Sequence, residues 1–425
     1  MEPGPTGLHR YSSSVSDHLN ADHERPLADS GLRVWGRANR RVVLLLLLGG
    51  AVAFQIAQGL AYQRRITPYK ASYWLVTYEF GFTRRGLAGE MLRRLAGTSP
   101  SLVAIEVAQY ALTAVILTLL LLLIRALWRR DNRAGDLAAL ALCCSPFVLD
   151  FAVFQRRPDQ IGYASVILFG FLLYRMPQQR TLVAAAGGAL LTISVAVSDS
   201  SFLACVGWVL LIAILAPGEN LRNLRTWSRL LLIALPPAIM AIVSATAGRL
   251  DHSQAQQLAS TASKYGWTDV VVFPYLTDTL RESVNRVGDM PQTMMLGSLA
   301  IGLVLLLLQG WLMLGLRVPT PTAASGIRFA PALAVAMCAI GLVALLALGI
   351  DWFRWISGFG FMGTTAVAFG VLLRPSERGP ANRALATPAT ILVSAYLLAV
   401  AAFPNMISLS EGFLQLLLAY NSAGP

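Results

Sequence analysis

Long apolar runs, separated by short polar and charged segments, dominate the pattern of this sequence. Stretches such as Val42–Leu48 and Leu119–Ile124 contain no polar side chain. A helix needs about 20 predominantly apolar residues to cross the hydrocarbon core of a bilayer. By that measure we expect about eleven membrane-spanning helices, with a short terminal helix over 413–420 as a possible addition. The expected spans are residues 42–62, 101–124, 135–154, 161–176, 182–198, 201–216, 229–247, 294–316, 329–350, 357–373 and 387–403.

This pattern predicts an all-α protein, a polytopic helical bundle in a membrane. Residues 1–40 are polar, rich in Ser, Pro, His and Asp, and have no periodicity, which is typical of a disordered tail. We therefore expect a disordered cytoplasmic tail over 1–40 and a transmembrane helical domain over 41–425. The longest external connections of that domain are predicted at 63–99 and 249–293.

The composition supports the membrane assignment. Of the 425 residues, 56% are hydrophobic and 13% are charged, whereas a soluble domain carries about 25% charged residues. This difference excludes a soluble enzyme and a disordered scaffold. The net charge of +12 resides almost wholly in arginines grouped between the apolar runs, which differs from the continuous basic patch of a nucleic-acid-binding protein.

The distribution of arginines predicts the orientation of the chain. Four of them, Arg33, Arg37, Arg40 and Arg41, precede the first apolar run, so the positive-inside rule favours a cytoplasmic N-terminus in a bacterial inner membrane. The alternate connections that follow are also basic. The exception is the loop over 63–99, which holds seven basic residues on the predicted external side. Most acids outside the tail fall on that side too, which favours chemistry at the extracytoplasmic face.

The sequence gives no sign of a cofactor. Its four cysteines, Cys143, Cys144, Cys205 and Cys338, lie within apolar segments and are expected to be buried and unpaired. There is no His/Cys cluster with zinc spacing and no Walker A loop. We expect no metal to be required, although a pair of carboxylates could hold Mg²⁺.

The segment Tyr78–Glu90 of the first external loop is the most informative part of the chain. Its continuation places Leu87, Met91, Leu92 and Leu95 on one helical face, which predicts an amphipathic helix in the membrane interface. Before that helix lie the carboxylate of Glu79 and the guanidiniums of Arg84 and Arg85. Paired guanidiniums bind phosphate oxygens well, and a nearby carboxylate can accept a proton from an attacking hydroxyl. The alternative is that these arginines only anchor the loop to anionic lipid headgroups.

The external turn Gln155–Gln160 is the second candidate. It combines Arg156, Arg157 and Asp159 between two spans, and these groups could face the first loop across a cleft. The alternative is a solvated hairpin tip with a local ion pair worth under about 1 kcal/mol.

Two further candidates lie later in the chain. Asp351 and Arg354, interleaved with tryptophans, could bind sugar hydroxyls or phosphate, or could be ordinary interfacial anchors. Asp199 lies in the break between two short helices. A carboxylate at membrane depth is costly without a partner, and we expect an external arginine to pair with it.

The loop over 249–293 contains spaced aromatic residues together with Asp269, Asp278 and Arg281. Residues 276–287 have helical character. This loop could be a lid, could bind an acceptor, or could simply pack over the bundle.

Residues 42–175 resemble the GT-C class of integral-membrane glycosyltransferases in architecture. In both, one span is followed by a long external loop with an amphipathic helix, an acid and arginines. The resemblance implies a sugar taken from a polyprenyl-phosphate donor and transferred to a glycan, lipid or protein acceptor in cell-envelope biosynthesis. It implies Glu79 and Asp159 as the catalytic acids. It also implies Arg84 and Arg85 as ligands of the lipid phosphate, with Arg156, Arg157, Asp199, Asp351 and Arg354 as further candidates for binding substrate.

Two other functions remain open at this point. An O-antigen or exopolysaccharide polymerase would share the external face, the arginines and a lipid-linked donor. A polytopic transporter or flippase would need a polar path through the bundle, for which only the break at Ser198–Ser201 is suggestive. A non-catalytic membrane partner is also compatible with the sequence.

Overall fold

The computed structural model describes residues 71–97, 101–130, 133–145, 147–148, 156–219, 221–265, 273–289, 292–314, 329–349 and 352–373, together with Leu46 and Gly50. The chain divides into two units, Met1–Leu47 and Leu48–Pro425, and the account below concerns the second. The predicted tail over 1–40 lies outside the described residues, as does the span over 387–403, the terminal helix over 413–420 and nearly all of the span over 42–62.

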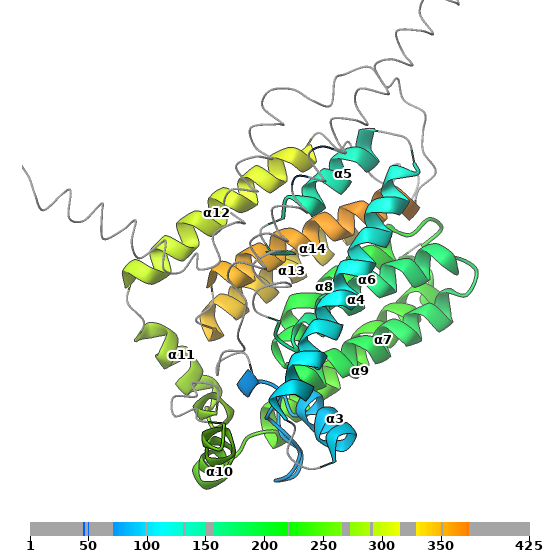
Figure 1. Cartoon of the computed structure of the whole chain (residues 1–425). Helices are drawn as coiled ribbons and strands as arrows, with labels where there is room; N and C mark the ends of the chain where they lie inside the picture. Colours follow the sequence, from blue (N-terminus) through cyan, green and yellow to red (C-terminus); the bar gives the residue numbers. More distant parts are fainter. Residues whose placement is uncertain are drawn as a thin grey trace, which may run out of the picture. The chain divides into compact units, whose positions relative to one another are not determined.

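Helices make up the described part of the chain, which contains no strand (Figure 1). The predicted all-α class is therefore confirmed. The helices are α3 (Leu87–Ala96), α4 (Leu102–Trp128), α5 (Arg133–Cys143), α6 (Gln160–Arg175), α7 (Arg180–Val197), α8 (Ser200–Leu215), α9 (Leu224–Ala247), α10 (His252–Ser263), α11 (Leu280–Gly288), α12 (Gln292–Leu314), α13 (Phe329–Leu348) and α14 (Trp352–Leu373), with a 3-10 turn, η2 (Pro274–Leu276).

Several helices have the length and composition of membrane spans. Among the described residues, α4, α7, α9 and α14 are long and apolar enough to cross a bilayer. Helices α4 and α9 keep large apolar side chains such as Leu121, Leu235 and Ile242 exposed. In water such a surface would be unfavourable, and in a bilayer it contacts lipid tails.

The central helices are α8 and α14, and their side chains form much of the main hydrophobic core. Phe361 and Phe369 of α14 and Val209 of α8 are fully buried in this core. Helix α8 contacts both α13 and α9, so it links these two helices within the bundle.

Close helix packing depends on glycine at the contact of α7 with α9. The carbonyl of Leu232 lies where a Cβ at Gly188 would be, only 2.1 Å from it. Pro236, four residues after Leu232 and inside α9, has no N–H to donate to that carbonyl. Gly188 thus lets α7 approach α9 at the point where the backbone ladder of α9 is interrupted.

Short helices gather at one end of the bundle, where α3, α10 and α11 lie (Figure 1). A second, smaller hydrophobic cluster holds α3 and α10, with Trp74, Leu92, Leu258 and Phe273 among its buried members, whereas α11 packs against α13. The predicted helix in the first loop is confirmed as α3, although Met91 and Leu95 point outward while Leu92 is buried. The helical character expected for 276–287 corresponds to α11.

The largest differences from the predicted spans are at α5, α9 and α14. Helix α5 ends at Cys143 rather than near residue 154, α9 begins at Leu224 rather than 229, and α14 begins at Trp352 rather than 357. The difference at α14 arises because Arg354 is only 7% exposed, inside the protein. An arginine beside tryptophans is typical of the edge of a membrane span, but here the carboxylate of Asp159 allows Arg354 to be buried.

Candidate functional site

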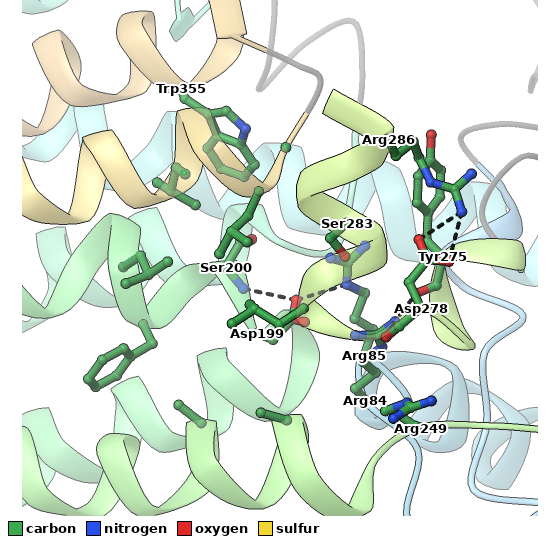
Figure 2. A pocket seen from close by; sticks show the side chains of 18 of the residues that line it. Arg84, Arg85, Asp199, Ser200, Arg249, Tyr275, Asp278, Ser283, Arg286 and Trp355 are labelled. Atoms are coloured by element: carbon green, nitrogen blue, oxygen red, sulfur yellow. Dashed lines mark hydrogen bonds and ion pairs between the residues drawn. The ribbon is translucent and has the colours of Figure 1, made fainter. Parts of the chain in front are cut away.

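A cavity of about 400 Å³ opens at the end of the bundle where the short helices gather (Figure 2). Its walls come from the loop before α3, the start of α8, the end of α9, the η2–α11 segment, the end of α13 and the start of α14. The charged residues among those that line it are Arg84, Arg85, Arg157, Arg249, Arg286, Arg354, Asp199 and Asp278. Apolar walls face these groups, formed mainly by Phe202, Leu203, Ala241, Ala245, Leu280, Leu345, Leu348 and Trp355.

Arg85 and Asp199 form an ion pair across this cavity. Arg85 Nε donates to Asp199 Oδ1 at 2.9 Å, and Asp199 Oδ1 also accepts from the backbone N–H of Ser200 at the start of α8. The prediction that an arginine pairs with Asp199 is thus confirmed, and the structure identifies this arginine as Arg85. Arg85 has a φ of +65°, a conformation uncommon outside glycine, and such strain often occurs at functional sites.

Each partner of this pair affects the pKa of the other. Burial alone would raise the pKa of the Asp199 carboxyl, but the charges of Arg85 and Arg84 outweigh burial and lower it. Burial likewise disfavours the Arg85 guanidinium, yet Asp199 more than compensates, so the pKa of Arg85 is raised. Both groups are therefore charged at neutral pH.

Arg84 fastens the neighbouring loops together. Its Nη2 donates to the backbone carbonyls of Tyr275 and Asp278, and its backbone N–H donates to the carbonyl of Gly248 at 2.8 Å. A Cβ on Gly248 would lie 2.8 Å from the Arg84 nitrogen, so only glycine allows this approach. Burial, followed by the charges of Arg85 and Arg249, lowers the pKa of Arg84, against the opposing charges of Asp199 and Asp278.

Asp278 and Arg286 form a second ion pair that lines the cavity (Figure 2). Arg286 Nη2 donates to both carboxylate oxygens of Asp278, at 2.7 and 2.8 Å. The guanidinium also lies 4.4 Å from the ring centre of Tyr275. The Thr279 side chain begins α11 with a capping box that includes Glu282, and this cap orients the helix so that Ser283 and Arg286 face the cavity.

Asp159 lies behind the cavity between two of its arginines. Its Oδ2 is 3.4 Å from Arg354 Nη1 and 3.8 Å from Arg157 Nε, and all three side chains are buried. The guanidinium of Arg157 stacks on Tyr73, and that of Arg354 stacks on Trp355. Such cation–π contacts favour guanidinium groups away from water.

The structure brings together most of the residues singled out from the sequence. Five of them line the cavity, namely Arg84, Arg85, Arg157, Asp199 and Arg354, and Asp159 contacts two of these. Glu79 is exposed and is not among the cavity residues, so its catalytic role gains no support from the geometry. Arg156 also lies away from the cavity, with its guanidinium 4.1 Å from the ring centre of Tyr110. Asp351 lies outside the described residues.

Sequence reasoning missed Arg249 and Arg286 and left Asp278 without a role. All three belong to the long loop after α9, whose charges have no periodicity. One local signal was available, the pair Thr279 and Glu282. This capping-box spacing fixes the start of a helix and places Arg286 two turns along it.

Guanidinium groups supply the positive charge of this site. Among the residues that the structure describes, no group of three or more His, Cys, Asp or Glu side chains could hold a metal ion. What the arrangement can do chemically follows from the arginines: it can bind an anion that also has an apolar part.

Comparison with known proteins places the chain among bacterial membrane proteins. Similar proteins include "Uncharacterized protein Rv1490" of Mycobacterium tuberculosis strain H37Rv and "Uncharacterized protein Mb1527" of Mycobacterium bovis, each 33% identical over 113 residues. That match covers 26% of this chain and 26% of each relative, so it spans about a quarter of their length. No solved structure matches the chain. The matched region includes Arg84, Asp199 and Arg249 of the cavity, because residues 45–262 match the family described as "Uncharacterised membrane protein Rv1490". The chain belongs to this family.

Proposed function

We propose that the protein is a membrane glycosyltransferase whose cavity binds the phosphate of a polyprenyl-linked sugar donor. The observation that carries this proposal is the composition of the cavity, where six arginines and two aspartates face an apolar wall. Planar guanidiniums bind phosphate oxygens through paired hydrogen bonds. A ligand with a phosphate at one end and a prenyl chain at the other matches both surfaces.

The proposed face of action is extracytoplasmic. The cavity lies at the ends of α7, α9 and α13 and at the starts of α6, α8 and α14, while clustered arginines such as Arg125, Arg180 and Arg225 lie at the opposite helix ends. The positive-inside rule assigns such a basic end to the cytoplasm. The donor would then reach the cavity from the outer leaflet.

Asp199 is the carboxylate best placed to act as the base. Its Oδ1 is occupied by Arg85 and Ser200, whereas none of the described residues donates a hydrogen bond to Oδ2. Both oxygens of Asp278 are occupied by Arg286, and Asp159 is buried behind Arg157 and Arg354. We therefore assign the proton transfer to Asp199 in preference to Glu79 or Asp159.

The reaction proceeds by displacement at the sugar. The acceptor hydroxyl oxygen bonds to the anomeric carbon, and the hydroxyl proton passes to Asp199. The bond between the anomeric carbon and the phosphate oxygen breaks, and its electron pair remains on that oxygen. The arginines stabilise the charge that develops on the departing lipid phosphate, which is the usual basis of such catalysis.

The test is sugar transfer in membranes that contain the wild-type protein or one of three variants at matched expression. Radiolabelled polyprenyl-linked sugars serve as donors. Asp199→Asn should lose transfer by about 10²–10³-fold, since it removes a general base, whereas Glu79→Gln should retain full transfer. Asp159→Asn should lower donor affinity, because Asp159 holds Arg157 and Arg354 in place.

Two outcomes would count against the proposal. Normal transfer by Asp199→Asn would remove Asp199 as the base. Tight binding of the lipid donor by wild type without any transfer to cell-envelope acceptors would favour a lipid carrier or flippase over a transferase.

A further inference from the structure

Two arginines lie next to each other at one end of the cavity. The backbone N–H of Arg84 donates to the carbonyl of Gly248 at 2.8 Å. Arg249 is the residue after Gly248, so it lies next to the segment that contains Arg84. Both side chains line the cavity, and Figure 2 shows them close together below Asp278 and Arg85. Two positive charges are thus held at short range on neighbouring segments.

Neither of these two arginines forms an ion pair with a described residue. Arg84 donates to two backbone carbonyls, which carry no net charge, and Arg249 is exposed at the rim. Two other arginines of the cavity do have carboxylate partners, since Arg85 is paired with Asp199 and Arg286 with Asp278. Arg84 and Arg249 therefore place two positive charges on the cavity lining with no carboxylate of the described residues within ion-pair distance, and carboxylates act on them only at longer range, Asp199 and Asp278 on Arg84 and Glu282 near Arg249.

We infer that the donor is linked to its lipid through pyrophosphate rather than through a single phosphate. This inference rests on the proposed function and specifies its substrate. A lipid–phosphate–sugar diester carries one negative charge, whereas the pyrophosphate-linked equivalent carries two, one each for Arg84 and Arg249. Two adjacent like charges repel each other, and a ligand with two negative charges relieves that repulsion at both.

The apolar wall accommodates the first part of the lipid. Ala241 and Ala245 of α9, Phe202 and Leu203 of α8, and Leu345 and Leu348 of α13 line the same cavity as the arginines. Helix α8 packs against both α9 and α13, so these three helices together supply the apolar lining. A prenyl chain that leaves the pyrophosphate along this lining would follow α9, whose large apolar side chains such as Leu235 and Ile242 are exposed.

A lipid pyrophosphate is also a suitable leaving group at this site. When the bond between the anomeric carbon and the phosphate oxygen breaks, the electron pair stays on the terminal phosphate. The leaving lipid pyrophosphate then carries one more negative charge than the bound donor. Arg84 and Arg249 are positioned to stabilise that charge as it develops.

The experiment compares two donors that share lipid and sugar and differ only in the linkage. A polyprenyl-phosphate N-acetylglucosamine and its polyprenyl-pyrophosphate counterpart are titrated against the purified full-length protein in lipid nanodiscs. One additional charge-assisted contact of ordinary strength corresponds to about tenfold in affinity. We expect the pyrophosphate donor to bind at least about tenfold more tightly. Inorganic pyrophosphate and inorganic phosphate are tested as competitors, so that the headgroup contribution is separated from that of the lipid.

Arg249→Gln is the informative variant, because Arg249 is exposed and its replacement leaves the fold intact. It should lower the affinity for the pyrophosphate donor to about that for the monophosphate donor, and so abolish the preference. Arg249→Lys keeps the charge and should keep most of the preference. Arg281→Gln is the matched control, since Arg281 is exposed on α11 and is not among the residues that line the cavity.

Each result has a distinct meaning. Equal affinity for the two donors would overturn the inference and leave the proposed function standing, and so would a preference that survives in Arg249→Gln. Failure of both donors to bind would overturn the proposed function itself. Equal affinity for inorganic pyrophosphate and for the complete donor would show that only the pyrophosphate is recognised, and would overturn the assignment of the apolar lining to the prenyl chain.

Discussion

The two ends of the helical bundle use the same kinds of charged residues in opposite ways. At one end, Glu219 accepts hydrogen bonds from Arg180, Arg229 and Thr226, each at 2.8 Å, and the adjacent cavity is only about 20 Å³. At the other end, arginines outnumber acids around a cavity of about 400 Å³. The first arrangement occupies its acid fully and ties α7, α9 and the loop between α8 and α9 together. The second leaves positive charge and space available for a ligand.

This difference shows that an arginine–carboxylate pair does not by itself mark a functional site. What distinguishes the cavity end is the excess of guanidiniums over carboxylates and the apolar wall opposite them. Arg85 in addition has a strained backbone conformation, whereas Arg180 and Arg229 lie in ordinary helices. Burying a charge without a partner is unfavourable, so an anion bound in this cavity would gain from the excess of guanidiniums.

The largest expected effect is the loss of sugar transfer in Arg85→Ala. This change removes one guanidinium from the proposed phosphate site and leaves Asp199 without its partner. We expect transfer to fall by about 10²–10³-fold, the usual cost of losing one group that stabilises developing charge. Initial rates in membranes at matched protein levels are the measurement.

Arg180→Ala at the opposite end is the matched control for that change. It removes an arginine that is also bonded to a carboxylate, yet transfer per folded molecule should remain near the wild-type rate. Equal losses in the two variants would remove the functional distinction between the ends.

Glu219→Gln should have the opposite effect to Arg85→Ala, because it should lower the stability of the fold and leave sugar transfer unchanged. The neutral side chain cannot satisfy two guanidiniums, so we expect the free energy of unfolding to fall by about 2 kcal/mol. Thermal unfolding in detergent measures the loss, and transfer at a temperature well below the transition should be unchanged. A fall in transfer without a fall in stability would mean that this end also takes part in the reaction.

Gly248→Ala tests the joint between Arg84 and the end of α9. An added Cβ would lie 2.7 Å from the carbonyl of Ser244 and 2.8 Å from the Arg84 nitrogen, so the two segments must separate. We expect donor affinity to weaken by about tenfold, since one charge-assisted contact is displaced. Gly288→Ala provides the comparison, because a Cβ there meets nothing within 4 Å. The measurement is equilibrium binding of the lipid-linked donor to the two variants, and equal affinities would show that the contact at Gly248 does not contribute to donor binding.

The sequence predicted the local features of the fold well and the pairings across it poorly. Apolar runs of about 20 residues are local, so most helices were found within a few residues of their bounds. The partner of Asp199 could be predicted to be an arginine, because burial of a lone carboxylate is costly. Which arginine it is depends on contacts between positions 114 residues apart, and no periodicity reports such contacts.

The two glutamates near Arg84 and Arg85, Glu79 and Glu90, illustrate this limit. Glu79 and Glu90 flank Arg84 and Arg85 almost symmetrically in the sequence, and the sequence favoured Glu79. In the structure Glu79 is exposed, while Glu90 is 4% exposed and is bonded to Arg93 and Arg94. The buried carboxylate is thus satisfied by its own helix, and the arginines of the cavity turn instead toward Asp199 and the η2–α11 segment.

Glu90 gives the smallest expected effect, a pH-dependent contribution to stability that leaves transfer unaffected. Hydrogen bonds from Arg93 and Arg94, and from the backbone N–H of Tyr78, lower the pKa of the Glu90 carboxyl to about 2 from an ordinary value of 4.5. Because the pKa is lowered in the folded protein, the stabilisation is complete above pH 4.5 and is lost as the pH falls from there toward about 2. The melting temperature of Glu90→Gln should therefore lie below that of wild type at pH 6, by a few degrees at about 1 kcal/mol, and the two should converge as the pH falls through that window. A difference that stays constant down to pH 3 would mean that Glu90 stabilises α3 through its shape and packing rather than through its charge.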